Sequence, residues 1–217
     1  MNCRFNNCNS TSGTTATQAY NGGAICVVGI NTLIVSSSLF FNCRAPQTNH
    51  DNGGSGGIYT RSLKKSFSVS LSSFISCFTG SSGAGVSFDA PSDHKLDTEI
   101  VNDCYCLQCS SDGISPDGGG MCLWDTFYTM KCTGCLFSGC STTGSGGGFC
   151  FRFGANSESY PIKFCFFADN TGKTGTDVCF YILYFDPCLH CFSTSAQNRV
   201  GYYDTTWTQS DFNWLLQ

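Results

Sequence analysis

The 217-residue sequence has little charge: Asp, Glu, Lys and Arg together make up 12% of it. The 11 basic residues are spread thinly, with Lys64 and Lys65 as the only adjacent pair, and the formal net charge is −4. Binding to nucleic acids and to anionic membranes depends on clustered basic residues. The composition therefore excludes nucleic acids and anionic membranes as the main partners.

Long apolar runs are missing as well. The longest, Val178 to Phe185, has 8 residues, whereas a membrane-spanning helix needs about 20. Met1 is followed directly by repeat material, without the charged stretch and apolar core of a secretory signal. We therefore expect no membrane insertion in this segment. Because the sequence opens in the middle of a repeat, we also expect further coils N-terminal to it.

Stretches with the periodicity of an amphipathic helix are scarce, whereas Gly (25), Phe (19) and Cys (17) are abundant. Short β-branched or aromatic runs bounded by Gly or Ser, such as Ile25 to Val28 and Val86 to Phe88, are typical of β-strands. The sequence therefore predicts a chain of short strands and tight turns.

Two sequence landmarks alternate along the chain. The first is Phe-x-x-Cys, whose last positions lie 30 to 35 residues apart. It comprises Phe5 to Cys8, Phe40 to Cys43, Phe74 to Cys77, Phe137 to Cys140 and two variants, Cys106 to Cys109 and Phe167 to Asn170. The second is a turn of small residues followed by an apolar residue, with glycine pairs at Gly22 and Gly23, Gly56 and Gly57, Gly119 and Gly120, and Gly147 and Gly148. This alternation indicates a repeat protein.

The length of the repeat decides the architecture. A unit of about 30 residues with two or three short strands is typical of one coil of a parallel β-helix, in which each strand pairs with its equivalent in the next coil. A β-propeller blade needs four strands in about 40 residues or more. We predict an all-β, right-handed, single-stranded parallel β-helix of about six coils over residues 1–186, followed by a C-terminal cap over residues 187–217.

The cysteines fall into columns, by which we mean residues at equivalent positions of successive coils. The first column contains Cys8, Cys43, Cys77, Cys109 and Cys140, the second Cys3, Cys104, Cys135 and Cys165, and the third Cys26, Cys122, Cys150 and Cys179. Parallel Cβ vectors at the spacing of the coils, about 4.8 Å, are farther apart than the roughly 3.8 Å that a disulfide prefers. We expect ladders of buried thiols that act as small apolar residues, with disulfides between coils as the alternative.

Three Cys-x-x-Cys pairs raise the question of a metal site: Cys106 and Cys109, Cys132 and Cys135, and Cys188 and Cys191. The first two pairs could together form a zinc ribbon, but the columns already account for them. The third pair lies outside the columns, where a cap or a local disulfide is the simpler interpretation. We therefore predict no metal and no cofactor.

Candidates for ligand binding stand three residues after the apolar residue of each glycine turn. This column contains Arg61, Asp89, Trp124, Arg152 and Tyr181. If it faces outward, Arg61 and Asp89 would be neighbours, and the last three residues would form a cation–π stack that could line a sugar-binding groove. The alternative is an ordinary ladder of side chains that stabilises the face of the sheet.

Two of the motifs carry a resemblance to known proteins. Gly-Gly-Ala-Ile at Gly22 to Ile25 and Phe-Ala-Asp-Asn at Phe167 to Asn170 resemble the double signature of the chlamydial polymorphic membrane proteins. With Cys in place of Asn in the other repeats, the chain is similar to the cysteine-bearing repeat proteins of trichomonad protozoa. The resemblance covers residues 3–185. It implies a β-helix at a cell surface or outside the cell, acting in adhesion or structure, with a host or neighbouring-cell protein or glycan as partner.

We therefore expect a non-catalytic, adhesin-like surface or structural module that presents the loops Asn9 to Asn21 and Arg44 to Ser55 to a protein or glycan. The alternative is a carbohydrate-active enzyme, a polysaccharide lyase or glycoside hydrolase on the same pectin-lyase-like fold. Such enzymes need carboxylates clustered on adjacent coils. The sequence places Asp89, Asp103 and Asp125 at different repeat positions, and we predict no catalytic residue.

Overall fold

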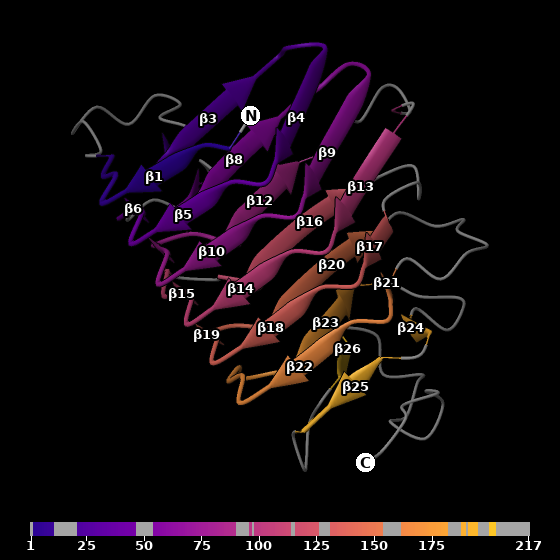
Figure 1. Ribbon diagram of the computed structural model, residues 1–217. Coiled ribbons are helices and arrows are strands. Elements are labelled where there is room, and N and C mark those ends of the chain that lie inside the picture. Colours follow the sequence, from indigo (N-terminus) through magenta and orange to yellow (C-terminus); the bar gives the residue numbers. More distant parts are fainter. Residues whose placement is uncertain are drawn as a thin grey trace.

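The protein is a stack of parallel β-strands. The computed structural model describes residues 2–10, 21–46, 54–89, 96, 98–113, 116–125, 131–153, 162–181, 188–189, 191–194 and 200–202. The regular structure in these residues is β-strand, and each sheet joins strands that are far apart in the sequence. Figure 1 shows the coils stacked from the N-terminus at the top to the C-terminus at the bottom. The predicted parallel β-helix is therefore confirmed.

Three long sheets make up the stack. Sheet 1 contains β3 (Ile25–Val28), β8 (Ile58–Arg61), β12 (Val86–Asp89), β16 (Met121–Asp125), β20 (Phe149–Phe153), β23 (Val178–Tyr181) and β26 (Val200–Tyr202). Sheet 2 contains β4 (Thr32–Ser36), β9 (Ser66–Ser70), β13 (Thr98–Asn102), β17 (Lys131–Thr133), β21 (Ile162–Lys163) and β24 (Cys188–Leu189). Sheet 3 contains β1 (Arg4–Asn6), β5 (Leu39–Phe41), β10 (Ser73–Ile75), β14 (Tyr105–Leu107), β18 (Leu136–Ser138), β22 (Phe166–Ala168) and β25 (Phe192–Ser193).

The chain visits these sheets in the order 1, 2, 3 and then returns to sheet 1 of the next coil. Two short sheets lie on the return path. One contains β6 (Arg44–Ala45), β11 (Phe78–Thr79), β15 (Ser110–Ser111) and β19 (Ser141–Thr142), and the other pairs β2 (Asn21–Gly22) with β7 (Gly54–Ser55). Each coil therefore repeats the same path and rests on the coil before it.

Sheet 3 places the phenylalanines of the Phe-x-x-Cys motif in one inward column. The register pairs Phe5 with Phe40, Phe40 with Phe74, and Phe137 with Phe167, with Cys106 between Phe74 and Phe137. The rings of the first three stack with centroids 4.7 Å apart, and those of Phe137 and Phe167 with centroids 5.1 Å apart. Stacked aromatic rings contribute beyond the area that they bury, so this column is a main element of the core.

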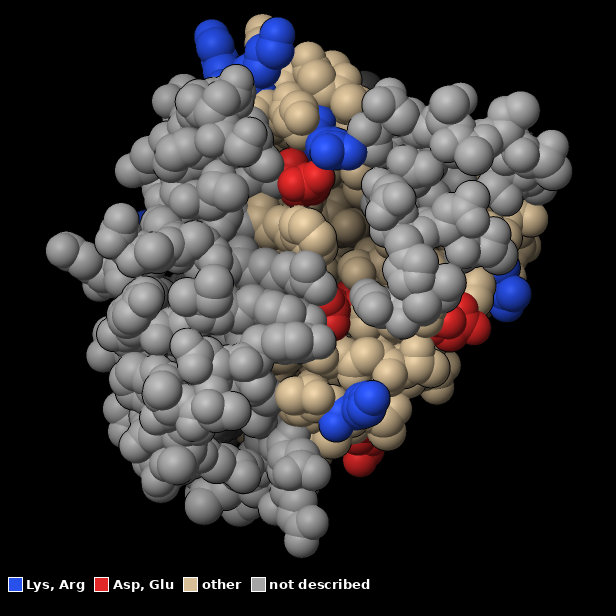
Figure 2. Space-filling view, turned by 180° about the vertical axis from the view of Figure 1, so that it is seen from behind, with Lys and Arg blue, Asp and Glu red and all other residues tan. Residues whose placement is uncertain are grey.

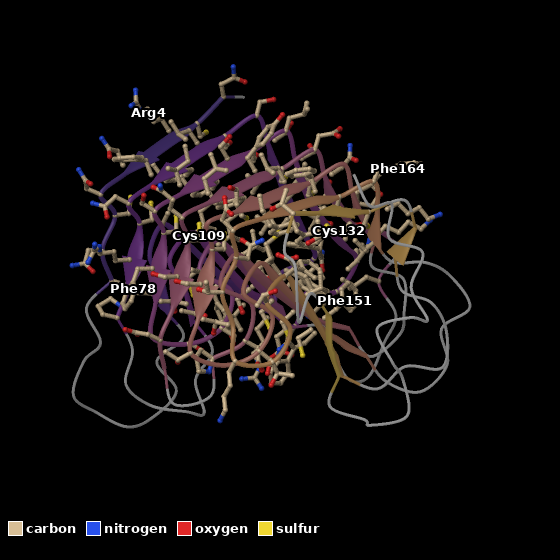
Figure 3. The ribbon with its side chains drawn as sticks, turned by 90° about the horizontal axis from the view of Figure 1, so that it is seen from below. Arg4, Phe78, Cys109, Cys132, Phe151 and Phe164 are labelled. Atoms are coloured by element: carbon tan, nitrogen blue, oxygen red, sulfur yellow. The ribbon has the colours of Figure 1, made fainter. Side chains whose placement is uncertain are left out.

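The other two sheets complete the interior with apolar columns. Inward residues of sheet 1 include Ile58, Val86, Met121, Phe149 and Val178, all fully buried. Inward residues of sheet 2 include Val35, Val69, Val101, Cys132 and Ile162. Figure 3, which views the stack from below, shows Cys109, Cys132 and Phe151 inside the coil and Arg4, Phe78 and Phe164 outside it.

The paired glycines are explained by the close approach of successive coils. A Cβ atom added to Gly120 would lie 2.5 Å from the backbone oxygen of Gly148 in the next coil and 3.0 Å from the Phe137 ring. The preceding glycine, Gly119, faces the backbone oxygen of Gly147 in the same way. Backbone atoms of the next coil cannot move aside without breaking the stack, so glycine is required at positions 119 and 120, although Ala84 and Asp177 stand at the equivalent positions of other coils.

The stack extends past the predicted boundary at residue 186. Strands β24 and β25 pair with β21 and β22 of the coil before, and β26 pairs with β23. Cys188 pairs with Ile162, and Ser193 pairs with Phe167. Residues 188–202 therefore contain β-helix strands where we expected a cap. The rest of the predicted cap, residues 203–217, lies outside the described residues.

The glycine corners yield the first prediction. Replacing Gly120 with Ala should lower the free energy of unfolding by about 2 kcal/mol or more, because overpacking against fixed backbone is costly. The matched control is Gly29→Asn, since Gly29 has φ +70° and nothing lies within 4 Å of an added Cβ, and Asn tolerates this conformation. Urea unfolding of the three proteins measures the difference. Equal stability of the Gly120→Ala variant and the parent would contradict the close approach.

Candidate functional site

The predicted ligand-binding column occupies consecutive positions on the outer face of sheet 1. The register pairs Val28 with Arg61, Arg61 with Asp89, Asp89 with Trp124, Trp124 with Arg152, and Arg152 with Tyr181. Alternation along β8 places Arg61 on the face opposite to the buried Ile58 and Thr60 columns. The sheet therefore brings the five candidates into one line, as expected from the repeat. Their role in binding stays a prediction.

Arg61 and Asp89 form an ion pair in this column. The Arg61 Nε atom lies 3.1 Å from Asp89 Oδ2, and about a third of each side chain is exposed. Burial raises the pKa of the Asp89 carboxyl above its usual value, and the Arg61 charge offsets part of that rise. The carboxylate is thus already engaged by a fixed cation, as in a structural cross-strand pair. Such partly exposed pairs contribute little to stability.

Trp124 lies next to this ion pair and contacts the neighbouring cysteine column. Its indole Nε1–H donates to the Cys122 Sγ atom at 3.0 Å, while 40% of the side chain stays exposed. The side chains of Arg152 and Tyr181 lie outside the described residues, and so does the predicted cation–π stack. The predicted binding loops, Asn9 to Asn21 and Arg44 to Ser55, likewise lie largely outside them.

The first cysteine column forms a regular series of hydrogen bonds between coils. Each thiol donates to the carbonyl of the residue at the Phe position of the preceding coil. The pairs are Cys43 to Phe5 at 3.7 Å, Cys77 to Phe40 at 3.7 Å, Cys109 to Phe74 at 3.3 Å, and Cys140 to Cys106 at 3.3 Å. Each thiol is also within reach of the carbonyl two residues earlier in its own coil. The cysteines are therefore donors that tie one coil to the next.

Asn170 occupies the first cysteine column in the Phe167 to Asn170 variant of the motif, and it also forms hydrogen bonds to the preceding coil. Its Nδ2 atom donates to the carbonyl of Phe137 at 3.0 Å, and its Oδ1 atom accepts from the Cys140 amide at 2.9 Å. A second Nδ2–H donates to Asp177 Oδ1 at 3.0 Å, and Ser193 Oγ donates to the other Asp177 oxygen. A cysteine in this column thus makes one of the two inter-coil hydrogen bonds that asparagine makes, the one to the carbonyl at the Phe position. The thiol is the weaker donor.

The second cysteine column stands at the corner between sheets 2 and 3. Serine occupies this column in two earlier coils, at Ser38 and Ser72. Cysteine occupies it in the next three coils, at Cys104, Cys135 and Cys165. Each of the five donates to the carbonyl two residues earlier, at distances from 2.8 to 3.5 Å. Cys191 follows in the next coil, two residues before Ser193, and is fully buried.

The placement of the third Cys-x-x-Cys pair requires a correction. Cys188 and Cys191 were interpreted as lying outside the columns. Cys188 pairs with Ile162 in sheet 2, and Cys191 continues the second column. The apolar landmark of this last coil is weak in the sequence, which is why the spacing alone did not reveal the register.

The third cysteine column forms a separate cluster on the outer side of sheet 1. Cys122, Cys150 and Cys179 pair in register and are fully buried, apart from the main core. Tyr59 and Ser87 occupy the same column in earlier coils and are also buried. This column therefore behaves as a small second core beside Trp124.

Burial raises the pKa of several column thiols, which stay protonated at neutral pH. Desolvation raises the pKa of Cys106 to about 12, and it raises the pKa values of Cys109, Cys150 and Cys165 well above their usual range. Cys104 is the exception, because a hydrogen bond with Cys135 lowers its pKa. Cysteines of all three columns, such as Cys109, Cys135 and Cys150, are free thiols in the described part of the chain. Since the nucleophile is the thiolate, these residues are suited to hydrogen bonding and packing rather than to nucleophilic catalysis.

One group of thiols could hold a metal ion. The Sγ atoms of Cys132, Cys135 and Cys165 all lie within 4.8 Å of one another, and the three side chains are buried. The zinc-ribbon interpretation joined Cys132 and Cys135 to Cys106 and Cys109 instead. Cys-x-x-Cys spacing identified two of the three residues, but the third comes from the next coil and becomes apparent only when the register is known.

The hydrogen bonds of Asn170 lead to a second prediction. Replacing Cys140, its neighbour in the column, with Asn should change the free energy of unfolding by less than about 1 kcal/mol, because the amide can donate to Cys106 as the thiol does. Cys140→Ala should cost about 2 kcal/mol, because it removes the donor and leaves a small cavity. Urea unfolding compares the two variants. If the Asn variant is as unstable as the Ala variant, the thiols are not equivalent to asparagine in this column.

Comparison of the chain with protein-family models, with curated proteins and with solved structures finds no match.

Proposed function

We propose that the protein is a non-catalytic, adhesin-like surface or structural module that binds a protein partner through the outer face of sheet 3. The observation that carries the proposal is the composition of that face. Most residues of its two outward columns are apolar: one column contains Arg4, Leu39, Ser73, Tyr105, Leu136 and Phe166, and the other contains Asn6, Phe41, Ile75, Leu107, Ser138 and Ala168.

These side chains occupy neighbouring positions on the outer face of sheet 3, and several of them are partly exposed. Tyr105 is 48% exposed, and Phe166 and Phe41 are each 40% exposed. Tyr105, Leu136 and Phe166 belong to three successive coils, so their side chains repeat at the spacing of the stack. Contiguous exposed apolar surface rimmed by polar residues marks interaction sites. Ser73 separates Leu39 from Tyr105 in this column, but no polar residue separates Tyr105, Leu136 and Phe166, and such a run of apolar side chains favours a protein partner over a sugar.

The distribution of acidic residues also supports a non-catalytic role. Within the registered strands of the described chain, Asp89 pairs with Arg61 and Trp124, Glu99 with Phe67, and Asp125 with Phe153. No two of these acidic positions are register partners, whereas lyases and hydrolases use paired acids. Figure 2 shows few charged side chains among uncharged ones on the described part of the face behind that of Figure 1, and near the top a basic and an acidic side chain lie side by side.

Surface location is part of the proposal and rests on the resemblance to the polymorphic membrane proteins. At the Asn position of the Phe-x-x-Asn motif, Asn170 makes inter-coil hydrogen bonds with Cys140 and Phe137. No helix of the described chain is long and apolar enough to cross a membrane.

Binding to an array of extracellular-matrix proteins and glycans tests the proposal. We expect the chain to bind at least one arrayed protein, and the double variant Tyr105→Ser/Phe166→Ser to bind it at least tenfold more weakly, because central aromatic residues dominate interface energies. The matched control is Ile34→Ser, which makes the same kind of change on sheet 2, where Ile34 is 69% exposed. This control should bind as the parent does.

Two results would contradict the proposal. One is binding that the double variant leaves unchanged. The other is release of unsaturated or reducing-end sugar from a polyuronide or neutral glycan that disappears in Asp89→Ala. The second result would identify the protein as a carbohydrate-active enzyme.

A further inference from the structure

The three thiols of Cys132, Cys135 and Cys165 come from two successive coils. Cys132 belongs to β17 and points inward from sheet 2, in the column of Val69 and Val101. The turn from Cys132 to Cys135 passes through Gly134, whose φ of +66° lets the chain bend sharply at the corner. Cys135 begins the corner to sheet 3, and Cys165 occupies the equivalent corner of the next coil. All three are at most 2% exposed.

The distances between these thiols match those of a metal site. The Sγ atoms of Cys132 and Cys165 are 3.9 Å apart, and all three Sγ atoms lie within 4.8 Å of one another. Three sulfur atoms that surround an ion in one plane, at metal–sulfur distances of about 2.3 Å, are about 4 Å apart. The structure therefore holds three sulfur ligands close to the positions that a trigonal site requires.

A fourth protein ligand does not fit this arrangement. The next thiols in the corner column are Cys104, one coil before Cys135, and Cys191, one coil after Cys165. Each of them contacts one thiol of the group, Cys104 that of Cys135 and Cys191 that of Cys165. Among the described residues, however, only Cys132, Cys135 and Cys165 form a group whose thiols all lie within 4.8 Å of one another. The Cys104 thiol also hydrogen-bonds to the carbonyls of Val69 and Asn102 at 3.6 and 3.3 Å.

The number and type of ligands indicate which metal ion the site would bind. Structural zinc sites have four protein ligands in a tetrahedron. Thiolates also favour Cu(I), a closed-shell ion that forms stable complexes with three sulfur ligands. We propose that Cys132, Cys135 and Cys165 bind one Cu(I) ion in a trigonal thiolate site inside the β-helix. On binding, each ligating thiol releases its proton to solvent, and no electron is transferred because the ion binds as Cu(I).

Anaerobic titration of the reduced chain with Cu(I), in competition with the chelator bicinchoninate, tests this site. We expect a tightest class of one ion per chain, and X-ray absorption should count three sulfur ligands around it. Cys132→Val should weaken this class by more than about 100-fold, because loss of a ligand costs more than loss of its supporting contacts. The substitution suits the fold, since valine occupies the same column at positions 69 and 101.

A second ligand variant and a control variant outside the site show whether the loss of binding is specific to the three thiols. Cys135→Ser should also abolish the tightest class, and serine occupies that column at Ser38 and Ser72. The control, Cys150→Ser, removes a thiol from the outer cluster, where Ser87 already stands, and it should bind Cu(I) as the parent does. Circular dichroism confirms the fold of each variant.

Three results would overturn the proposal. The first is unchanged tightest binding in Cys132→Val and Cys135→Ser. The second is loss of that binding in Cys150→Ser. The third is Zn(II) that binds one per chain with four sulfur ligands and displaces Cu(I), which would show that a fourth thiol joins the site.

Discussion

The structure depends on the hydrogen bonds that hold each coil at a fixed register on the coil before it. Because every coil follows the same path, a side chain meets its own equivalent about 4.8 Å away on each side. Any residue type that recurs in the repeat therefore becomes a column. Phenylalanines become a stack of rings, such as that of Phe5, Phe40 and Phe74, and cysteines become ladders of thiols. Glycines allow the backbones to approach at the corners, as at Gly120.

The thiol ladders show how a parallel β-helix can use cysteine in place of asparagine. A buried carbonyl at a corner needs a donor, and Asn170 supplies one to Phe137 while Cys140 supplies one to Cys106. The thiol is a weaker donor, but it is small and apolar enough to pack in the core. High pKa values keep it protonated, as for Cys106. The same burial and register that suit cysteine to this role also bring Cys132, Cys135 and Cys165 together.

The sequence predicted what depends on spacing within and between repeats. The parallel β-helix, the cysteine columns and the neighbouring positions of Arg61 and Asp89 all follow from a constant rise per coil, and the ion pair confirms the last of these. Contacts that join different columns were missed, because spacing says nothing about side-chain direction: the contact of Trp124 with Cys122 and the approach of Cys165 to Cys132 are examples. The strands after residue 186 were missed because Ser193 stands where the motif has Phe.

The central claim is that stacked cysteines serve this fold as reduced donors and ligands rather than as crosslinks. The most direct test is alkylation of the purified chain in denaturant without reductant, followed by mass spectrometry of the intact protein. The account predicts that all 17 cysteines take up the reagent. A chain in which cysteines are protected in pairs, leaving only a few modified, would contradict it and show that disulfides link the coils.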